Sequence, residues 1–171
     1  MILAATPIRQ PLSGEYTERI YDIDSVWKTD EWSWLLFESE SDSWCGEFRG
    51  AFRGVAVSEK LRLVVVLTED CMYLLDIETA AVIDSLLQPQ YVDITVTPDG
   101  NILVADGYGI ELFRGRSVAA IECITVPVHP DYLRFREYDG NRLRITCYEC
   151  GVWDEELELY LDCDSFEWID A

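Results

Sequence analysis

The sequence has 171 residues, of which 49% are hydrophobic, enough for one domain with a substantial core and too many for an intrinsically disordered chain. Its 33 acidic residues outnumber 13 basic ones, which gives a formal net charge of −20. Such a charge repels phosphate backbones and anionic membranes, so it argues against nucleic-acid and membrane partners and favours a basic protein. A halophilic or simply very soluble surface is the alternative explanation.

The first twelve residues predict an apolar strand and a linker interrupted by Pro7 and Pro11. The apolar run is too short for a signal peptide, and no run in the sequence approaches the length of a membrane span. The six cysteines are therefore expected to be reduced thiols in a cytoplasmic protein.

An alternating strand is predicted over residues 16–23 and an aromatic strand over 32–37, which leads into a polar turn at 38–43. The sequence from Asp30 to Glu47 is rich in acidic residues and contains no lysine or arginine. We expect it to be one candidate surface for a basic partner. The candidate binding residues of this stretch are Glu38, Glu40, Asp42 and Trp44.

The middle of the chain predicts short strands separated by tight turns. Residues 61–67 form a nearly continuous apolar run, typical of a strand covered on both faces. Residues 80–87 are the one stretch that could be helical, but their β-branched side chains favour a strand. Residues 91–124 predict four strands, with glycine-containing turns at 98–100 and 107–109.

This four-strand pattern recurs along the chain, because Val55, Ile94 and Leu133 fall on equivalent positions about forty residues apart. Such self-similarity is the signature of propeller blades. The prediction is a single all-β domain, residues 1–171, with about four four-stranded antiparallel units in a small or incomplete β-propeller-like fold. A β-sandwich is the alternative. The units are expected at residues 16–53, 54–90, 91–127 and 128–171.

The stretch 96–113, VTPDGNILVADGYGIELF, resembles blades of the NHL and YVTN type of β-propeller repeat. The resemblance covers residues 91–124 and, less closely, 55–86; the chain departs from these families in its small number of units and its tryptophan-rich ends. It implies a scaffold in which the N-terminal strand could pair with the last unit and close a ring. Because propellers host many activities, the resemblance implies no particular function.

The last unit contains an alternating strand from Glu156 to Asp164, within the sequence EELELYLDCD. Leucines and Cys163 fall on one face, and acidic residues with Tyr160 fall on the other, about 6.7 Å apart. We expect this ladder of carboxylates to bind the partner; protection of a sheet edge against aggregation is the alternative, and core packing is the alternative for each tryptophan. The candidate binding residues here are Glu149, Trp153, Asp154, Glu155, Glu156, Glu158, Tyr160, Asp162, Asp164 and Trp168.

Signals for catalysis and metal binding are weak. The single histidine, His129, lies in a predicted loop, and the Gly-x-Ser-x-Gly motif of serine hydrolases does not occur. Cys147-x-x-Cys150 has the spacing of a zinc knuckle or redox pair, but a metal could add only Cys163 and His129 to it. We therefore predict no catalytic residue, no metal, no cofactor and no enzymatic activity.

Size, single-domain character and charge resemble the immunity proteins of bacterial toxin systems, a likeness of type without a diagnostic motif. The resemblance implies an acidic inhibitor, monomeric or in a 1:1 complex, that occupies the cationic groove of a basic nuclease-type toxin. Two alternatives belong to other classes. One is a propeller-like module that binds a small ligand or peptide, and the other is a structural subunit of a larger assembly.

Overall fold

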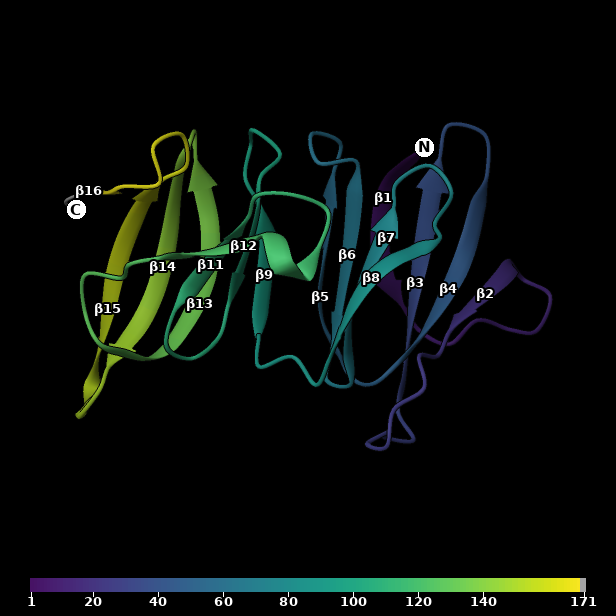
Figure 1. Ribbon diagram of the computed structural model, residues 1–171, viewed down its shortest axis with the longest axis horizontal. Helices are drawn as coiled ribbons and strands as arrows, with labels where there is room; N and C mark the ends of the chain where they lie inside the picture. The colour runs from purple at the N-terminus through teal and green to yellow at the C-terminus, as the bar shows by residue number, and fades with distance from the viewer. Residues whose placement is uncertain (170–171) are drawn as a thin grey trace. The chain divides into compact units, whose positions relative to one another are not determined.

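The computed structural model describes residues 1–169, except for the side chains of Trp153 and Asp154. These residues form sixteen β-strands in four four-stranded sheets and one short 3-10 helix, η1 (Val118–Ala120) (Figure 1). The predicted all-β, propeller-like fold class is confirmed by this strand organisation. Within the described residues, no helix has the length and apolar character that crossing a membrane requires.

The chain divides into two compact units, Met1–Pro89 with Arg116–Val118, and Gln90–Gly115 with Ala119–Ala171. The first unit holds two sheets. One has the strand order β1-β3-β4-β2, and the other follows the chain order β5-β6-β7-β8. Their strands are β1 (Ile2–Ile8), β2 (Thr17–Tyr21), β3 (Trp32–Ser39), β4 (Ser43–Arg49), β5 (Phe52–Ser58), β6 (Leu63–Thr68), β7 (Cys71–Asp76) and β8 (Val82–Leu87).

The second unit also holds two sheets, and both keep the chain order of their strands, which gives β12-β11-β10-β9 and β13-β14-β15-β16. The strands of the third sheet are β9 (Asp93–Val96), β10 (Ile102–Ala105), β11 (Ile110–Phe113) and β12 (Ile121–Ile124). Those of the fourth sheet are β13 (Pro130–Asp139), β14 (Arg142–Glu149), β15 (Val152–Asp162) and β16 (Trp168–Ile169).

The first sheet departs from the simple repeat. β1 pairs with β3 and completes this sheet, so the expectation that the N-terminal strand pairs with the last unit is wrong. β2 runs parallel to β4, whereas the other strand pairs are antiparallel. The next three sheets keep the predicted equivalence, because Val55, Ile94 and Leu133 all lie on the first strand of a sheet, β5, β9 and β13. As predicted from its apolar run, every residue of β6 is buried.

Two turns between strands are built in the same way. Asp76 Oδ1 accepts hydrogen bonds from the backbone N–H of Thr79 at 2.9 Å and from its hydroxyl at 3.0 Å. Asp162 Oδ1 accepts the same pair of hydrogen bonds from Ser165, at 2.8 and 3.0 Å. Because these bonds favour the ionised carboxylate, with the backbone N–H as the largest cause, they lower the pKa of Asp162 and lower that of Asp76 to about 2.

A cluster of aromatic rings forms the core of the first unit. Phe37 stacks on Trp44 with ring centroids 4.2 Å apart, and Tyr21 stacks on Phe48 at 4.4 Å. Gly46 lies on β4 directly beneath these rings. A Cβ atom at Gly46 would lie 2.6 Å from Cε2 of Phe48 and 2.7 Å from Cε2 of Phe37, so only glycine allows this packing.

Candidate protein-binding surfaces

The acidic strand predicted near the C-terminus is β15, and arginines of β13 and β14 neutralise part of its polar face. Arg144 is ion-paired with Glu158 and, at 2.9 Å, with Glu137. Arg136 lies 3.5 Å from Glu156. Two carboxylates of the predicted ladder, Glu156 and Glu158, are therefore paired with arginines. A basic partner would have to displace these arginines to reach the carboxylates.

Three other predicted members of the ladder have partners of their own. Tyr160 donates a hydrogen bond to Glu158 at 2.9 Å, and the Arg142 guanidinium lies 3.8 Å from the centre of the Tyr160 ring. The Tyr160 hydroxyl and, after it, Arg144 lower the pKa of Glu158. Asp162 caps the turn described above, and Asp164 accepts a hydrogen bond from Asn141. Each of these side chains therefore has an intramolecular partner, and their role in partner binding stays a prediction.

The remaining candidates of this stretch differ in exposure. Glu155 is exposed and Glu149 is half-buried. Trp168 is half-buried, packs against the core of the second unit, and donates an indole N–H to the carbonyl of Thr125 at 2.6 Å. Trp153 and Asp154 were also predicted to bind the partner, but their side chains lie outside the described part of the chain.

Sequence reasoning missed the arginines that face β15. Two adjoining hollows of about 510 and 260 Å³ lie on this face of the fourth sheet. Arg144 lines both of them, with Arg136 in the first and Arg142 in the second. A period-two spacing of arginines was visible in the sequence, but the pairing of Arg144 with Glu158 depends on a strand register that the spacing does not reveal.

The other predicted acidic stretch, the β3–β4 turn, keeps its charges exposed. Glu38, Glu40 and Asp42 are all exposed, and the described part of the chain places no cation in an ion pair with them. Trp44, predicted as an apolar anchor beside them, is instead only 6% exposed, and the Arg19 guanidinium covers its ring at 4.3 Å. Its inward position on β4 makes it a core residue, which is the alternative stated for each tryptophan.

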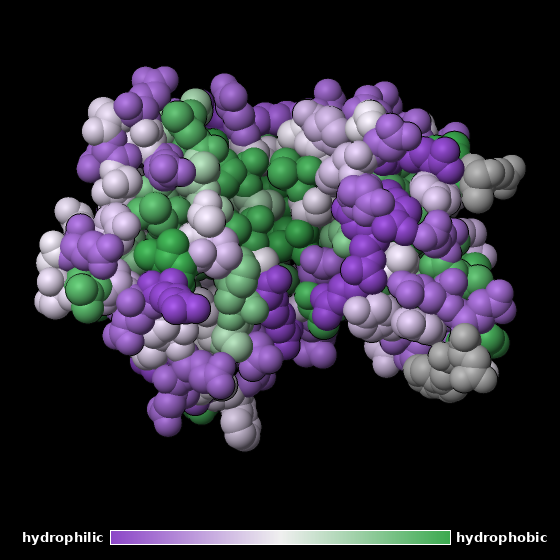
Figure 2. Space-filling view, turned by 180° about the vertical axis from the view of Figure 1, so that it is seen from behind, coloured by the Kyte–Doolittle hydropathy of each residue, from purple (hydrophilic) through white to green (hydrophobic). Residues whose placement is uncertain are grey.

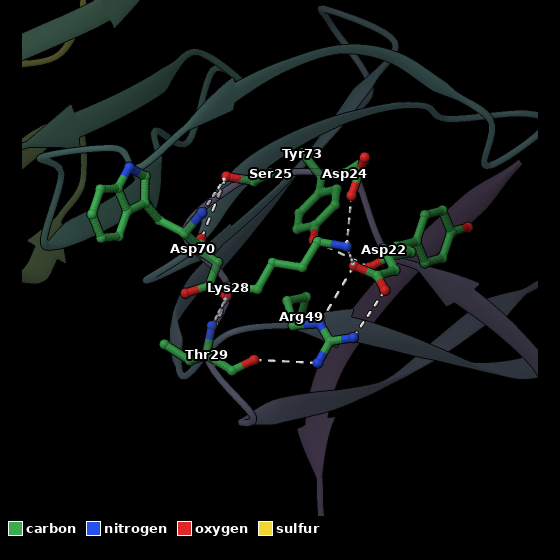
Figure 3. A network of polar contacts seen from close by, with 10 residues as sticks. Asp22, Asp24, Ser25, Lys28, Thr29, Arg49, Asp70 and Tyr73 are labelled. Atoms are coloured by element: carbon green, nitrogen blue, oxygen red, sulfur yellow. Dashed lines mark hydrogen bonds and ion pairs between the residues drawn. The ribbon is translucent and has the colours of Figure 1, made fainter.

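A network of polar contacts holds the loop between β2 and β3 in the first unit (Figure 3). Lys28 lies 3.2 Å from both Asp22 and Asp24, and Arg49 contacts Asp22 at 2.9 Å. Figure 3 shows Lys28 directed between the two aspartates, with Arg49 on the other side of Asp22. Arg49, followed by Lys28, lowers the pKa of Asp22 through hydrogen bonds to the carboxylate.

The same loop is attached to the second sheet through Asp70. This residue is only 8% exposed, and its Oδ2 atom accepts hydrogen bonds from the Thr29 backbone N–H at 2.9 Å and the Thr29 hydroxyl at 3.2 Å. Arg49 donates to the Thr29 carbonyl at 3.2 Å. Arg49 of β4 and Asp70 of the β6–β7 turn thus fix a loop that has no regular secondary structure.

The tip of this loop exposes two large apolar side chains, Val26 at 93% and Trp27 at 68%. Sequence reasoning missed Trp27 as a candidate. Its exposure could have been predicted from the sequence, because Trp27 lies among Asp, Ser, Lys and Thr residues and outside any alternating pattern that would bury it. The space-filling view shows that apolar residues interrupt the hydrophilic surface on the face it presents (Figure 2).

A groove of about 410 Å³ lies at the other end of the same loop, where β3 begins. Trp32, Trp34 and Phe52 contribute aromatic side chains to it, and Glu31 lies at its edge. The Arg49 guanidinium covers the Trp32 ring at 4.0 Å, so the groove adjoins the polar network. These half-buried tryptophans remain available as the apolar part of an interface.

The cysteine pair of the last unit is split between interior and surface, since Cys147 is buried and Cys150 is exposed. The backbone N–H of Cys150 donates to the carbonyl of His129 at 2.8 Å. Among the residues described here, no group of three or more His, Cys, Asp or Glu side chains is arranged to hold a metal ion.

Comparison with protein-family models and with curated proteins gave no match. Among solved structures, the chain is similar to the N-terminal domain of Nup159, with a TM-score of 0.47 and 10% identity over 71% of this chain and 34% of that one. It is also similar to a chain in the S. cerevisiae complex of Dbp5 bound to Nup159, Gle1, IP6 and ADP, with a TM-score of 0.47 and 9% identity over the same shares. The chain thus spans about a third of the length of the chains it matches. Similarity at this level says nothing about partners or activity.

Proposed function

We propose that the protein is a stoichiometric binding module for a basic protein, and not an enzyme. The β3–β4 turn carries this proposal, because Glu38, Glu40 and Asp42 are exposed and have no ion-pair partner within the described residues. Glu156 and Glu158 are already paired with arginines. On a chain with a net charge of −20, unpaired carboxylates attract a cationic surface and accelerate encounter with it.

The partner that this charge favours most is a basic nuclease-type toxin. Carboxylates can occupy a cationic groove that otherwise holds the phosphates of nucleic acid, and binding there would exclude the substrate. In this form of the proposal, the protein is a cytoplasmic immunity protein that acts as a monomer in a 1:1 complex. Its support is the charge and size of the chain together with the exposed acidic turn.

Charge reversal at the turn tests the proposal. The partner is the basic protein recovered by chemical crosslinking in the native host and then purified. We expect Glu38→Lys/Glu40→Lys to slow its association about tenfold at low salt and to flatten the salt dependence of the rate. The control, Glu59→Lys/Glu167→Lys, changes the net charge equally at two exposed carboxylates elsewhere, and we expect a change below about twofold.

Two outcomes contradict the proposal. If both double variants slow association equally, net charge rather than the β3–β4 turn attracts the partner. If no basic protein binds the wild-type chain at low salt, the binding function itself is wrong. A nuclease assay with the purified partner then decides the toxin form, since an immunity protein abolishes that activity at a 1:1 ratio.

The two alternative functions stay predictions with tests of their own. A module for a small ligand or peptide predicts that a ligand raises the melting temperature regardless of salt concentration. A structural subunit predicts a mass in solution that is a multiple of the chain mass.

A further inference from the structure

We propose that Val26 and Trp27 form an apolar anchor that inserts into a pocket of the partner protein, and that the network around Asp22, Lys28 and Asp70 holds this anchor in its binding conformation. The inference rests on the proposed function, because it assigns a second contact to the same basic partner. It adds a site that neither acidic stretch contains.

Exposure distinguishes Trp27 from the other tryptophans whose side chains are described. Trp44 is buried, and Trp32, Trp34 and Trp168 are half-buried, whereas Trp27 is 68% exposed beside Val26 at 93%. A single exposed apolar residue is common on proteins, but adjacent Val and Trp side chains at a loop tip form a protruding apolar knob. Tryptophan is among the residues most enriched in the energetic centres of protein interfaces.

The loop that carries this anchor is fixed before any partner binds. Lys28, next to Trp27 in sequence, bridges Asp22 and Asp24 at 3.2 Å each. Thr29 is held by the nearly buried carboxylate of Asp70 through two hydrogen bonds. The Ser25 hydroxyl accepts a hydrogen bond from the Trp27 backbone N–H at 3.3 Å. A pre-ordered loop loses less conformational entropy on binding, so its apolar contact contributes more affinity.

The surroundings of the tip define the chemistry of the partner. Lys28 is ion-paired with Asp22 and Asp24, so its charge is balanced within the loop, and Asp30 and Glu31 are exposed on the C-terminal side. An apolar pocket that receives Trp27 would therefore meet these carboxylates at its rim. Since a rim of the same sign would repel them, the geometry points to a pocket bordered by Lys or Arg. The aromatic groove of Trp32 continues this surface through Arg49.

The test uses the full chain in its native host. Trp27 is replaced by the photo-crosslinking residue p-benzoylphenylalanine, and Tyr108, which is 72% exposed, is replaced in a matched control. We expect position 27 to crosslink one basic protein that position 108 does not. That protein is then purified and titrated with Trp27→Ala and Tyr108→Ala. Binding should weaken at least roughly 30-fold for Trp27→Ala and less than about twofold for Tyr108→Ala.

Each other outcome overturns the inference. It fails if position 27 gives no crosslink above the control, if the crosslinked protein is acidic or a second copy of this chain, or if Trp27→Ala binds normally. An unchanged melting temperature shows that Trp27→Ala remains folded, as expected for an exposed residue. If Glu38→Lys/Glu40→Lys weakens binding of a basic partner and Trp27→Ala does not, the anchor inference fails and the proposed function stands. If the wild-type chain binds no basic protein, both proposals fall.

Discussion

Replacing Asp70 by alanine is expected to release the loop between β2 and β3 while the sheets stay folded. Asp70 Oδ2 accepts hydrogen bonds from the Thr29 N–H and hydroxyl at 2.9 and 3.2 Å. A hydrogen bond to a charged group contributes about 1.5–3 kcal/mol, and a buried partner that loses it is poorly compensated by water. Loss of the hydrogen bond from the Thr29 N–H should therefore lower the free energy of local opening of this loop by about 2 kcal/mol. The Thr29 amide should then exchange roughly 30-fold faster.

Hydrogen exchange of the Thr29 amide measures this effect directly. Asp70→Asn is the matched variant, because it keeps an oxygen acceptor in the same place, and we expect exchange less than about fivefold faster than in the wild type. Amides of β6 and β7 serve as the internal control for global stability. The reasoning is refuted if Thr29 exchanges at the wild-type rate in Asp70→Ala, or if the β6 and β7 amides accelerate as much as Thr29.

Three further predictions concern stability and reactivity. Gly46→Ala should lower the free energy of unfolding in urea by about 1–3 kcal/mol, because its Cβ would overlap two buried rings. Gly109→Ala should change it by less than about 0.5 kcal/mol, because its Cβ would make only an ordinary contact, 3.9 Å from Asp106 Oδ1. Asp76 has a folded pKa of about 2, below its ordinary value, so the stability it contributes is present above about pH 4 and is lost as the pH falls toward 2. Asp76→Asn should therefore make the melting temperature less dependent on pH between about pH 4 and pH 2. Cys150 and Cys123, the exposed cysteines, should react with a thiol reagent at pH 8 in the folded protein, whereas the four buried cysteines should not. Cys123 should react more slowly than Cys150, because its thiol donates to Glu111, which raises its pKa. Labelling of more than two cysteines in the folded protein would contradict the described burial.

Much of the fold follows from local sequence. The continuous apolar run of β6 predicts a strand buried on both faces, and the alternation in β15 predicts which side chains face the core. These predictions succeed because a strand turns each successive side chain to the opposite face, whatever lies beyond it. The turn at Gly100, with φ of 80°, succeeds for a similar reason, since only a few residue types adopt that backbone conformation readily.

Side-chain partners far apart in sequence are decided by the tertiary structure alone. Arg144 reaches Glu158 because β14 and β15 pair in one register, and a shift of one residue would turn Arg144 to the opposite face. Thr29 meets Asp70 from 41 positions away, and that contact holds the loop of the exposed Trp27, whereas Trp44 is buried by stacking on Phe37. Sequence alone determined where the charges and aromatic residues lie along the strands. Which charges are neutralised, and which tryptophan remains at the surface, depends on strand register and packing between sheets.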